Sequence, residues 1–276
     1  MARLSADTFA RPPDMTDRDD PAVLYVESYL LIRTLVGILG IALPLVLIVG
    51  ELYLSGDVHV RGSLSAYYHT AMRDVFVAAL CVTGFLLATY LSGQTRTWDF
   101  RLSLLAGVAV IGVVFFPTSR SGLPDGAPRC GSTPEPAGCS PVQQQFGESL
   151  VATVHFACAA VFILSLAAMC FLFARREQKW ENDRKMVRFQ YACGAAILAA
   201  VAWVAIGGLL KATVWEITPL YLGEVVAVWA FGASWLAKGK NLRSLLRGRP
   251  QPAAPAATEP APAPRAAPVS GTPGIR

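Results

Sequence analysis

The residues best suited to chemistry lie in one short stretch, residues 63–74, which reads Ser-Leu-Ser-Ala-Tyr-Tyr-His-Thr-Ala-Met-Arg-Asp. Ser65 and His69 are four residues apart, so a helix that begins early would place them on one face with Arg73. Asp74 would then lie about 140° from His69, unless the helix starts later and the preceding turn folds back. A hydroxyl, an imidazole and a carboxylate are groups that hydrolytic and zinc sites use.

The chain has two further histidines: His59 lies ten residues before His69, and His155 lies inside a later apolar stretch. Three imidazoles with an open fourth position suit a catalytic zinc that activates water, with a carboxylate as the proton acceptor. These residues give one hypothesis, a zinc-dependent membrane hydrolase of an amide or ester lipid bond. Its catalytic residues would be Ser65, Asp74 and Glu224, and its zinc ligands would include His69 and His155.

The same region also predicts a polar pocket near one surface of a membrane. Counted at 1.5 Å per residue from the outer end of each apolar stretch, Glu51 lies within roughly 5 Å of the surface, and His155 and Glu224 lie roughly 9 and 11 Å below it. Charges inside membrane spans are costly and commonly functional. We therefore expect an outward-facing pocket in the outer leaflet that binds a lipid headgroup, a small ligand or a membrane partner. Its predicted lining consists of Glu51, Tyr67, Tyr68, Arg73, Lys211 and Trp215, with Tyr221 at the aromatic rim.

Each of these groups also has a purely architectural interpretation. Asp74 suits the first turn of a helix, where the helix dipole favours a negative charge, and the two tyrosines are typical of an interfacial aromatic belt. A hydrogen bond between helices would satisfy His155. Glu224 must be paired with Lys211 or His155, or be protonated. The sequence leaves the functional and architectural interpretations open.

The elements that position these residues are membrane-spanning helices. The chain has 276 residues, of which 54% are hydrophobic and only 16% charged, and its mean hydropathy is +0.45. Apolar stretches of about 20 residues recur, each long enough to cross roughly 30 Å of hydrocarbon. The predicted fold is an all-α integral membrane bundle of six helices, with spans at residues 30–53, 74–91, 102–116, 149–173, 189–210 and 217–235. We expect close packing through small residues, notably Gly37 and Gly40 in the first span and Ala192, Ala196 and Ala200 in the fifth.

The distribution of Lys and Arg predicts the orientation of the bundle. Basic segments are retained on the cytoplasmic side. If both termini are cytoplasmic, the inner segments hold thirteen basic residues near the spans, among them the run from 175 to 188. The outer segments hold only five: Arg61, Arg73, Arg120, Arg129 and Lys211. The sequence therefore predicts a multi-pass protein of the plasma membrane with both termini in the cytoplasm.

Cysteine positions support the same orientation. Cys130 and Cys139 lie in the long segment 118–148, which this topology places outside, where thiols oxidise. Eight residues separate them, so we expect a disulfide that stabilises the loop by about 2–3 kcal/mol; two free thiols are the alternative. The other four cysteines lie inside spans, where they suit apolar packing.

The two ends of the chain have compositions that do not form a core. Residues 1–24 combine acids with prolines and predict a disordered cytoplasmic arm. Residues 249–276 alternate Pro and Ala and predict a disordered cytoplasmic tail, which leaves residues 25–248 as the transmembrane domain. The sequence has no basic patch interleaved with aromatic residues, so we do not expect nucleic acid as a partner. Membrane lipids are the expected surroundings.

The pattern Ser65-x-x-x-His69 followed by Asp74 resembles that of the membrane hydrolases that include alkaline ceramidases and the progestin and adipoQ receptor-like proteins. The resemblance implies that these three residues match that family's serine, first zinc histidine and aspartate. The family has seven spans and a His-x-x-x-His pair in the last one, whereas this sequence predicts six spans and has His155 alone in the fourth.

The longer run from Ser65 to Val77, with Phe-Phe-Pro-Thr at 115–118 and His155, is similar to an uncharacterised family of bacterial integral membrane proteins. Membership of that family implies a fold and no particular activity.

Overall fold

The computed structural model describes residues 21–56, 61–90, 96–120, 123–124, 126–180, 183–210 and 217–248. Within these ranges the chain is helical and contains no strand. In chain order the elements are α1 (Pro21–Ser55), the 3₁₀-helix η2 (Ser65–His69), α2 (Arg73–Thr89), α3 (Trp98–Phe115), α4 (Pro141–Phe146), α5 (Glu148–Trp180), α6 (Arg184–Leu210) and α7 (Pro219–Gly248). Residues 1–20 of the predicted arm and the whole predicted tail, 249–276, lie outside the described ranges.

Five of the described helices are long and apolar enough to cross a membrane, and they comprise α1 from Ser28 on, α3, α5, α6 and α7 as far as Ala237. The mean hydropathy of their most apolar windows runs from 1.4 to 2.6. The all-helical, multi-pass character of the chain is therefore confirmed. Helix α2, which covers the second predicted span, has 17 residues.

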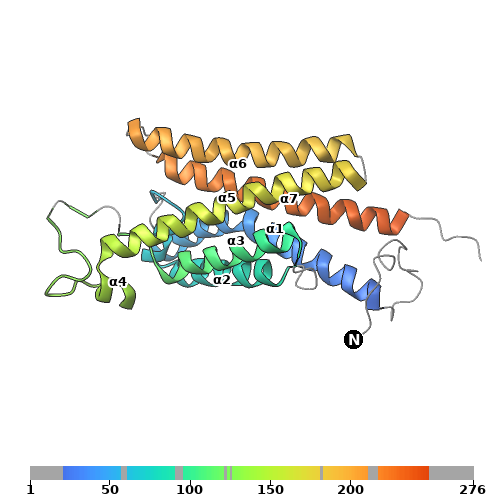
Figure 1. Cartoon of the computed structure of the whole chain (residues 1–276). Coiled ribbons are helices and arrows are strands. Elements are labelled where there is room, and N and C mark those ends of the chain that lie inside the picture. The colour runs from blue at the N-terminus through green and yellow to red at the C-terminus, as the bar shows by residue number, and fades with distance from the viewer. Residues whose placement is uncertain are drawn as a thin grey trace, which may run out of the picture.

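The six long helices form a closed ring around a common core (Figure 1). Helix α1 packs against α7, α7 against α6, α6 against α5, α5 against α3 and α3 against α2, and a smaller contact of α2 with α1 closes the ring. The start of α1 and the end of α7 lie at one end of the bundle, and α4 lies at the other (Figure 1). We call the second end the loop end, formed by residues 51–56, 61–73, 116–120, 123–124, 126–148 and 217–224.

Glycines allow the contact between α1 and α7. A Cβ atom on Gly37 would lie 2.6 Å from Cγ of Leu236 and 2.9 Å from the carbonyl oxygen of Gly232. A Cβ atom on Gly232 would in turn lie 2.9 Å from the carbonyl oxygen of Gly37. The predicted role of Gly37 in close helix packing is thus confirmed, because only hydrogen fits between these two backbones.

The outer surface of the bundle is apolar, as lipid contact requires. Large hydrophobic side chains such as Val49, Phe85, Val108 and Ile206 are more than half exposed. A soluble protein rarely exposes such a continuous apolar surface. Helices α5 and α6 also extend past the predicted spans, so the basic run 175–188 between those spans is helical up to Trp180 and again from Arg184. Charged residues are good helix formers, and a helix need not end where its hydrophobic stretch ends.

Candidate functional site

The segment that carries Ser65 and His69 is the short 3₁₀-helix η2, which is separate from α2. A 3₁₀-helix has three residues per turn, so residues four apart point to different sides. Ser65 is turned towards α7, and His69 is turned towards the segment after α3. Of the two arrangements that the sequence allowed, the structure has the later helix start.

Ser65 and the backbone next to it bind the carboxylate of Glu224. The Leu64 N–H donates to Oε2 of Glu224 at 2.5 Å, and the Ser65 hydroxyl lies beside the same carboxylate. The Ser63 hydroxyl lies 3.2 Å from that of Ser65. In addition, Oγ1 of Thr218 donates to the carbonyl of Gly62, so this segment is fixed to the beginning of α7. Ser65 and Glu224 therefore do come together, as part of one polar contact between η2 and α7.

His69 binds a backbone carbonyl at the loop end. Its Nε2–H donates to the Thr118 oxygen at 2.7 Å, and Nε2 of Gln143 donates to the same oxygen at 3.0 Å. The other ring nitrogen, Nδ1, is buried and has no partner among the described residues. Burial lowers the pKa of His69, and the nearby guanidinium groups of Arg73 and Arg120 act in the same direction. The imidazole is thus neutral at pH 7, and Nδ1 carries a free lone pair.

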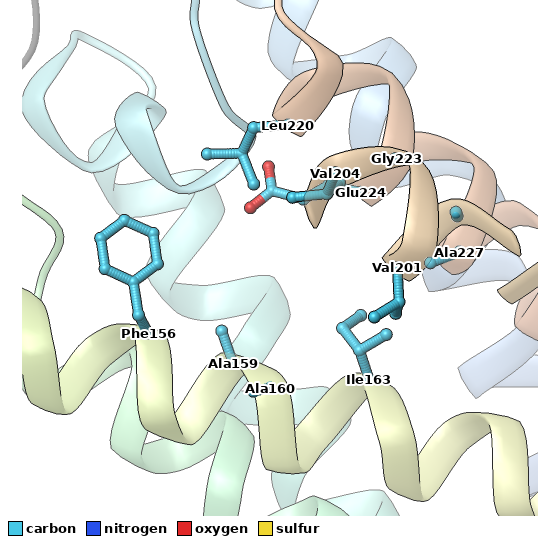
Figure 2. Close-up of a pocket in the computed structure, with 11 residues that line it drawn as sticks. Phe156, Ala159, Ala160, Ile163, Val201, Val204, Leu220, Gly223, Glu224 and Ala227 are labelled. Atoms are coloured by element: carbon cyan, nitrogen blue, oxygen red, sulfur yellow. The ribbon is translucent and has the colours of Figure 1, made fainter. Parts of the chain in front are cut away.

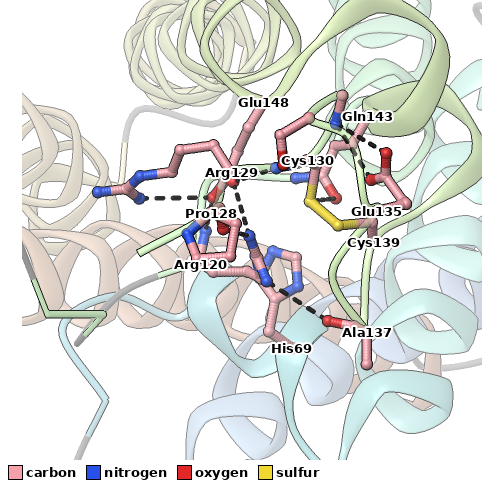
Figure 3. A network of polar contacts seen from close by, with 12 residues as sticks. His69, Arg120, Pro128, Arg129, Cys130, Glu135, Ala137, Cys139, Gln143 and Glu148 are labelled. Atoms are coloured by element: carbon pink, nitrogen blue, oxygen red, sulfur yellow. Dashed lines mark hydrogen bonds and ion pairs between the residues drawn. A yellow bond between two sulfur atoms is a disulfide. The ribbon is translucent and has the colours of Figure 1, made fainter. Parts of the chain in front are cut away.

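A buried carboxylate, Glu148, organises the loop end (Figure 3). Its side chain is 3% exposed, and it accepts hydrogen bonds from the Arg120 N–H at 2.7 Å, the Arg120 guanidinium at 3.2 Å and the Cys130 N–H at 3.0 Å. Arg129 forms a longer ion pair with it, at 3.7 Å. The predicted disulfide between Cys130 and Cys139 is present in the structure. Glu148 therefore holds both the chain that leaves α3 and the disulfide loop.

The other residues of the predicted pocket lie around the same end. Glu51 is buried and pairs with Arg61 at 2.6 Å. Tyr67 is buried next to Tyr221, with its hydroxyl bonded to the Arg61 backbone. Arg73 stacks on the Tyr68 ring, with Cζ 4.5 Å from the ring centre, and its Nε donates to the Tyr68 carbonyl at 3.0 Å.

A polar cavity of about 290 Å³ lies at the loop end between η2 and the segment after α3. Its charged or titratable lining residues are Arg61, His69 and Arg120, and Ala66, Thr70, Leu123, Ala137 and Gly138 complete it. Nε of Arg120 is buried and has no partner among the described residues. Both Arg120 and His69 thus bring unused hydrogen-bonding capacity to one cavity, and the charged groups among its described lining residues are cationic.

The described residues do not assemble the predicted zinc ligands. Nδ1 of His155 donates to the carbonyl oxygens of Phe116, at 2.8 Å, and Val113, at 3.2 Å, at the end of α3. Asp74 is exposed in the first turn of α2. Within the part of the chain that the structure describes, the group of three potential ligands that lies close enough for a metal consists of the two disulfide cysteines and Glu135. Lys211 and Trp215 of the predicted pocket and His59 of the metal hypothesis lie outside the described residues, and so does any pairing of Glu224 with Lys211.

Sequence reasoning missed the roles of Arg120 and Glu148. The signal that was available is their position, since Arg120 follows the end of α3 and Glu148 begins α5, and both flank the loop that the disulfide closes. An arginine and a glutamate at the two ends of one closed loop are well placed to form an ion pair.

The chain was compared with protein families, curated proteins and solved structures. Residues 38–237 match the model of a family described as "Protein of unknown function (DUF998)". No curated protein and no solved structure matches the chain, and the resemblance to alkaline ceramidases has no support from these comparisons.

Proposed function

We propose that this chain, which belongs to the DUF998 family of proteins of unknown function, is a six-span protein of the plasma membrane that binds a phosphate group in its loop-end cavity. The observation that supports this function is the cavity lined by Arg61, His69 and Arg120. Arginine is well suited to phosphate because its planar, always charged group donates several hydrogen bonds. The volume of about 290 Å³ fits a headgroup-sized ligand better than a whole lipid.

The membrane orientation that we propose makes the loop end external. Helix α2 has 17 residues and spans about 25 Å, which is enough for a sixth, short crossing. Six crossings put the beginning of α1 and the end of α7 on one side, in agreement with their position in Figure 1. The basic residues near that end keep it in the cytoplasm, and the disulfide loop then faces the oxidising side.

Membrane-impermeant thiol labelling tests this orientation. Gln145→Cys places a thiol on exposed α4 at the loop end, and Gln178→Cys places one near the end of α5 at the opposite end. In intact cells we expect the first variant to be labelled and the second to be labelled only after lysis. The unsubstituted chain, whose four free cysteines lie inside the helices, is the background control. Labelling of Gln178→Cys in intact cells would refute the proposed topology.

Two sources would supply the phosphate group, a lipid headgroup and free inorganic phosphate. The purified chain in nanodiscs is titrated with inorganic phosphate, and separately its unfolding midpoint is compared in nanodiscs that contain or lack phosphatidic acid.

His69→Phe is the test variant, because Gln143 still bonds the Thr118 carbonyl after the imidazole is removed. We expect this variant to bind about tenfold more weakly or worse, since Nδ1 of His69, once it takes up a proton beside the anion, donates a hydrogen bond that phenylalanine cannot make.

The matched control is Arg129→Gln, which removes a loop-end charge from a side chain that is 57% exposed and does not line the cavity. It should retain nearly full affinity. Equal weakening by both substitutions would show nonspecific attraction to positive charge and would refute the site. Stoichiometric zinc that is lost in His69→Phe would instead support the hydrolase alternative.

Phosphate affinity should depend on pH through His69. Burial lowers the pKa of the free imidazole, and an anion bound beside it would raise that pKa because it favours the charged form. A group that takes up a proton on binding makes binding tighter as the pH falls. We therefore expect the unsubstituted chain to gain affinity relative to His69→Phe as the pH falls from 8 towards 5, although protonation of phosphate itself lowers its negative charge and weakens binding in both proteins. Identical profiles in the two proteins would contradict a role for the imidazole.

A further inference from the structure

A second cavity, of about 180 Å³, lies between α5, α6 and α7 and shares no residue with the loop-end cavity. Alanines, valines and other apolar residues form almost all of its wall, and Glu224 is the single ionisable residue among the described ones that line it. Figure 2 shows the Glu224 carboxylate extending from α7 into the space between Leu220 and Phe156. All three helices are long and apolar enough to cross a membrane, and the proposed topology therefore places this cavity within the bilayer.

The carboxylate of Glu224 is incompletely satisfied by the protein. It accepts a hydrogen bond from the Leu64 N–H and has the Ser65 hydroxyl beside it, whereas a carboxylate offers about four acceptor positions. No described cation pairs with it. A carboxylate in apolar surroundings is costly unless it takes up a proton or a positive charge accompanies it.

The volume and the apolar walls of the cavity restrict the kind of ligand whose positive charge could pair with the Glu224 carboxylate. A cavity of about 150 Å³ with apolar walls accommodates a benzene-sized group, so 180 Å³ accepts one ring or a short alkyl segment. Phe156 and Val201 at its edge are 46% and 36% exposed on the lipid-facing surface, which gives an apolar molecule a route from the membrane.

From the lone carboxylate and the apolar walls we infer that this cavity binds an amphiphilic amine. Its ammonium group pairs with Glu224, and its hydrocarbon segment occupies the space between α5, α6 and α7. The ligand reaches the site sideways from the bilayer. This site is independent of the proposed phosphate site.

The experiment compares octylamine with octanol, two probes that share the alkyl chain and differ in the charged head. Binding to the full chain in detergent at pH 7.5 is measured by calorimetric titration and by the shift of the unfolding midpoint. We expect octylamine to bind at least about tenfold more tightly than octanol. Glu224→Gln, which keeps an acceptor for the Leu64 N–H, should abolish this preference.

A second pair of variants leaves the carboxylate in place. Ala160→Leu fills the cavity and should weaken the binding of both probes, whereas Ala157→Leu adds the same side chain at an exposed position of α5 outside the cavity and should weaken neither. His69→Phe, which tests the phosphate site, should leave octylamine binding unchanged. Equal affinity for octylamine and octanol, or an unchanged preference in Glu224→Gln, would overturn the inference.

Discussion

Replacement of Glu148 by leucine is expected to lower the free energy of unfolding by about 3–5 kcal/mol, because it removes one partner of a buried charged contact. The carboxylate is 3% exposed and accepts from two backbone N–H groups, those of Arg120 and Cys130, as well as from the Arg120 guanidinium. Leucine has a similar size but no acceptor, so the N–H groups of Arg120 and Cys130 would lose their partner, whereas the Arg120 guanidinium would keep its bonds to the carbonyls of Pro128 and Ala137. Thermal unfolding of the purified chain in detergent measures the loss.

Glu135→Gln is the matched control for Glu148→Leu. Glu135 lies in the same disulfide loop and also accepts from a backbone N–H, that of Gly131 at 3.1 Å, but it is exposed. Water replaces an exposed hydrogen bond, so the control should cost less than about 1 kcal/mol. If both substitutions shifted the unfolding midpoint equally, Glu148 would not organise the loop end.

The helices were predictable from the sequence because hydrocarbon thickness fixes the length of an apolar stretch. A helix that spans a membrane must satisfy its own backbone, so an uninterrupted stretch of apolar residues has one stable structure. The disulfide was predictable for a similar reason, because Cys130 and Cys139 are close in sequence and lie in the one long loop. The contact between Glu224 and Ser65 was only partly predictable: both residues were expected near one end of the bundle, but not as partners.

The detailed partners at the loop end depend on the path of irregular segments. Whether η2 is a 3₁₀-helix or the first turn of α2 decides if Ser65 and His69 share a face, and residue spacing alone does not distinguish the two. His155 binds the carbonyls at the end of α3, and His69 binds the carbonyl of Thr118. Unpaired carbonyls occur at the end of every helix and carry no sequence signature. Side-chain types therefore indicated a polar site but could not indicate which polar groups were already paired with backbone.

The second large expected effect on stability comes from replacing Arg33, which lies at the opposite end of the bundle. Its side chain is 1% exposed, and its Nη1 donates to Tyr29 at 3.1 Å and to Tyr90 at 2.8 Å. The guanidinium carbon lies 4.2 Å from the centre of the Phe173 ring and 5.0 Å from that of Trp235. Nε and Nη2 have no partner among the described residues, and no described carboxylate pairs with this charge. Aromatic faces and phenol oxygens thus provide its stabilisation.

Two substitutions separate the volume of Arg33 from its charge. Arg33→Ala leaves a cavity among Tyr29, Tyr90, Phe173 and Trp235, and it should lower the free energy of unfolding by about 2–5 kcal/mol. Arg33→Met keeps most of the volume and removes a buried charge with unpaired donors, so it should be neutral or even stabilising. The two tyrosines remain satisfied, because the Tyr90 hydroxyl donates to the Tyr29 hydroxyl at 2.8 Å.

The order of unfolding midpoints in detergent is therefore the measurement that decides the role of Arg33. We expect Arg33→Met to equal or exceed the unsubstituted chain and Arg33→Ala to lie well below both. Arg33→Lys should lie between them, because lysine keeps the charge but loses the planar stacking on Phe173. If Arg33→Met destabilised the bundle as much as Arg33→Ala, the guanidinium charge itself would hold α1 in place. The bundle would then keep a buried charge with unpaired donors despite the cost of burying it.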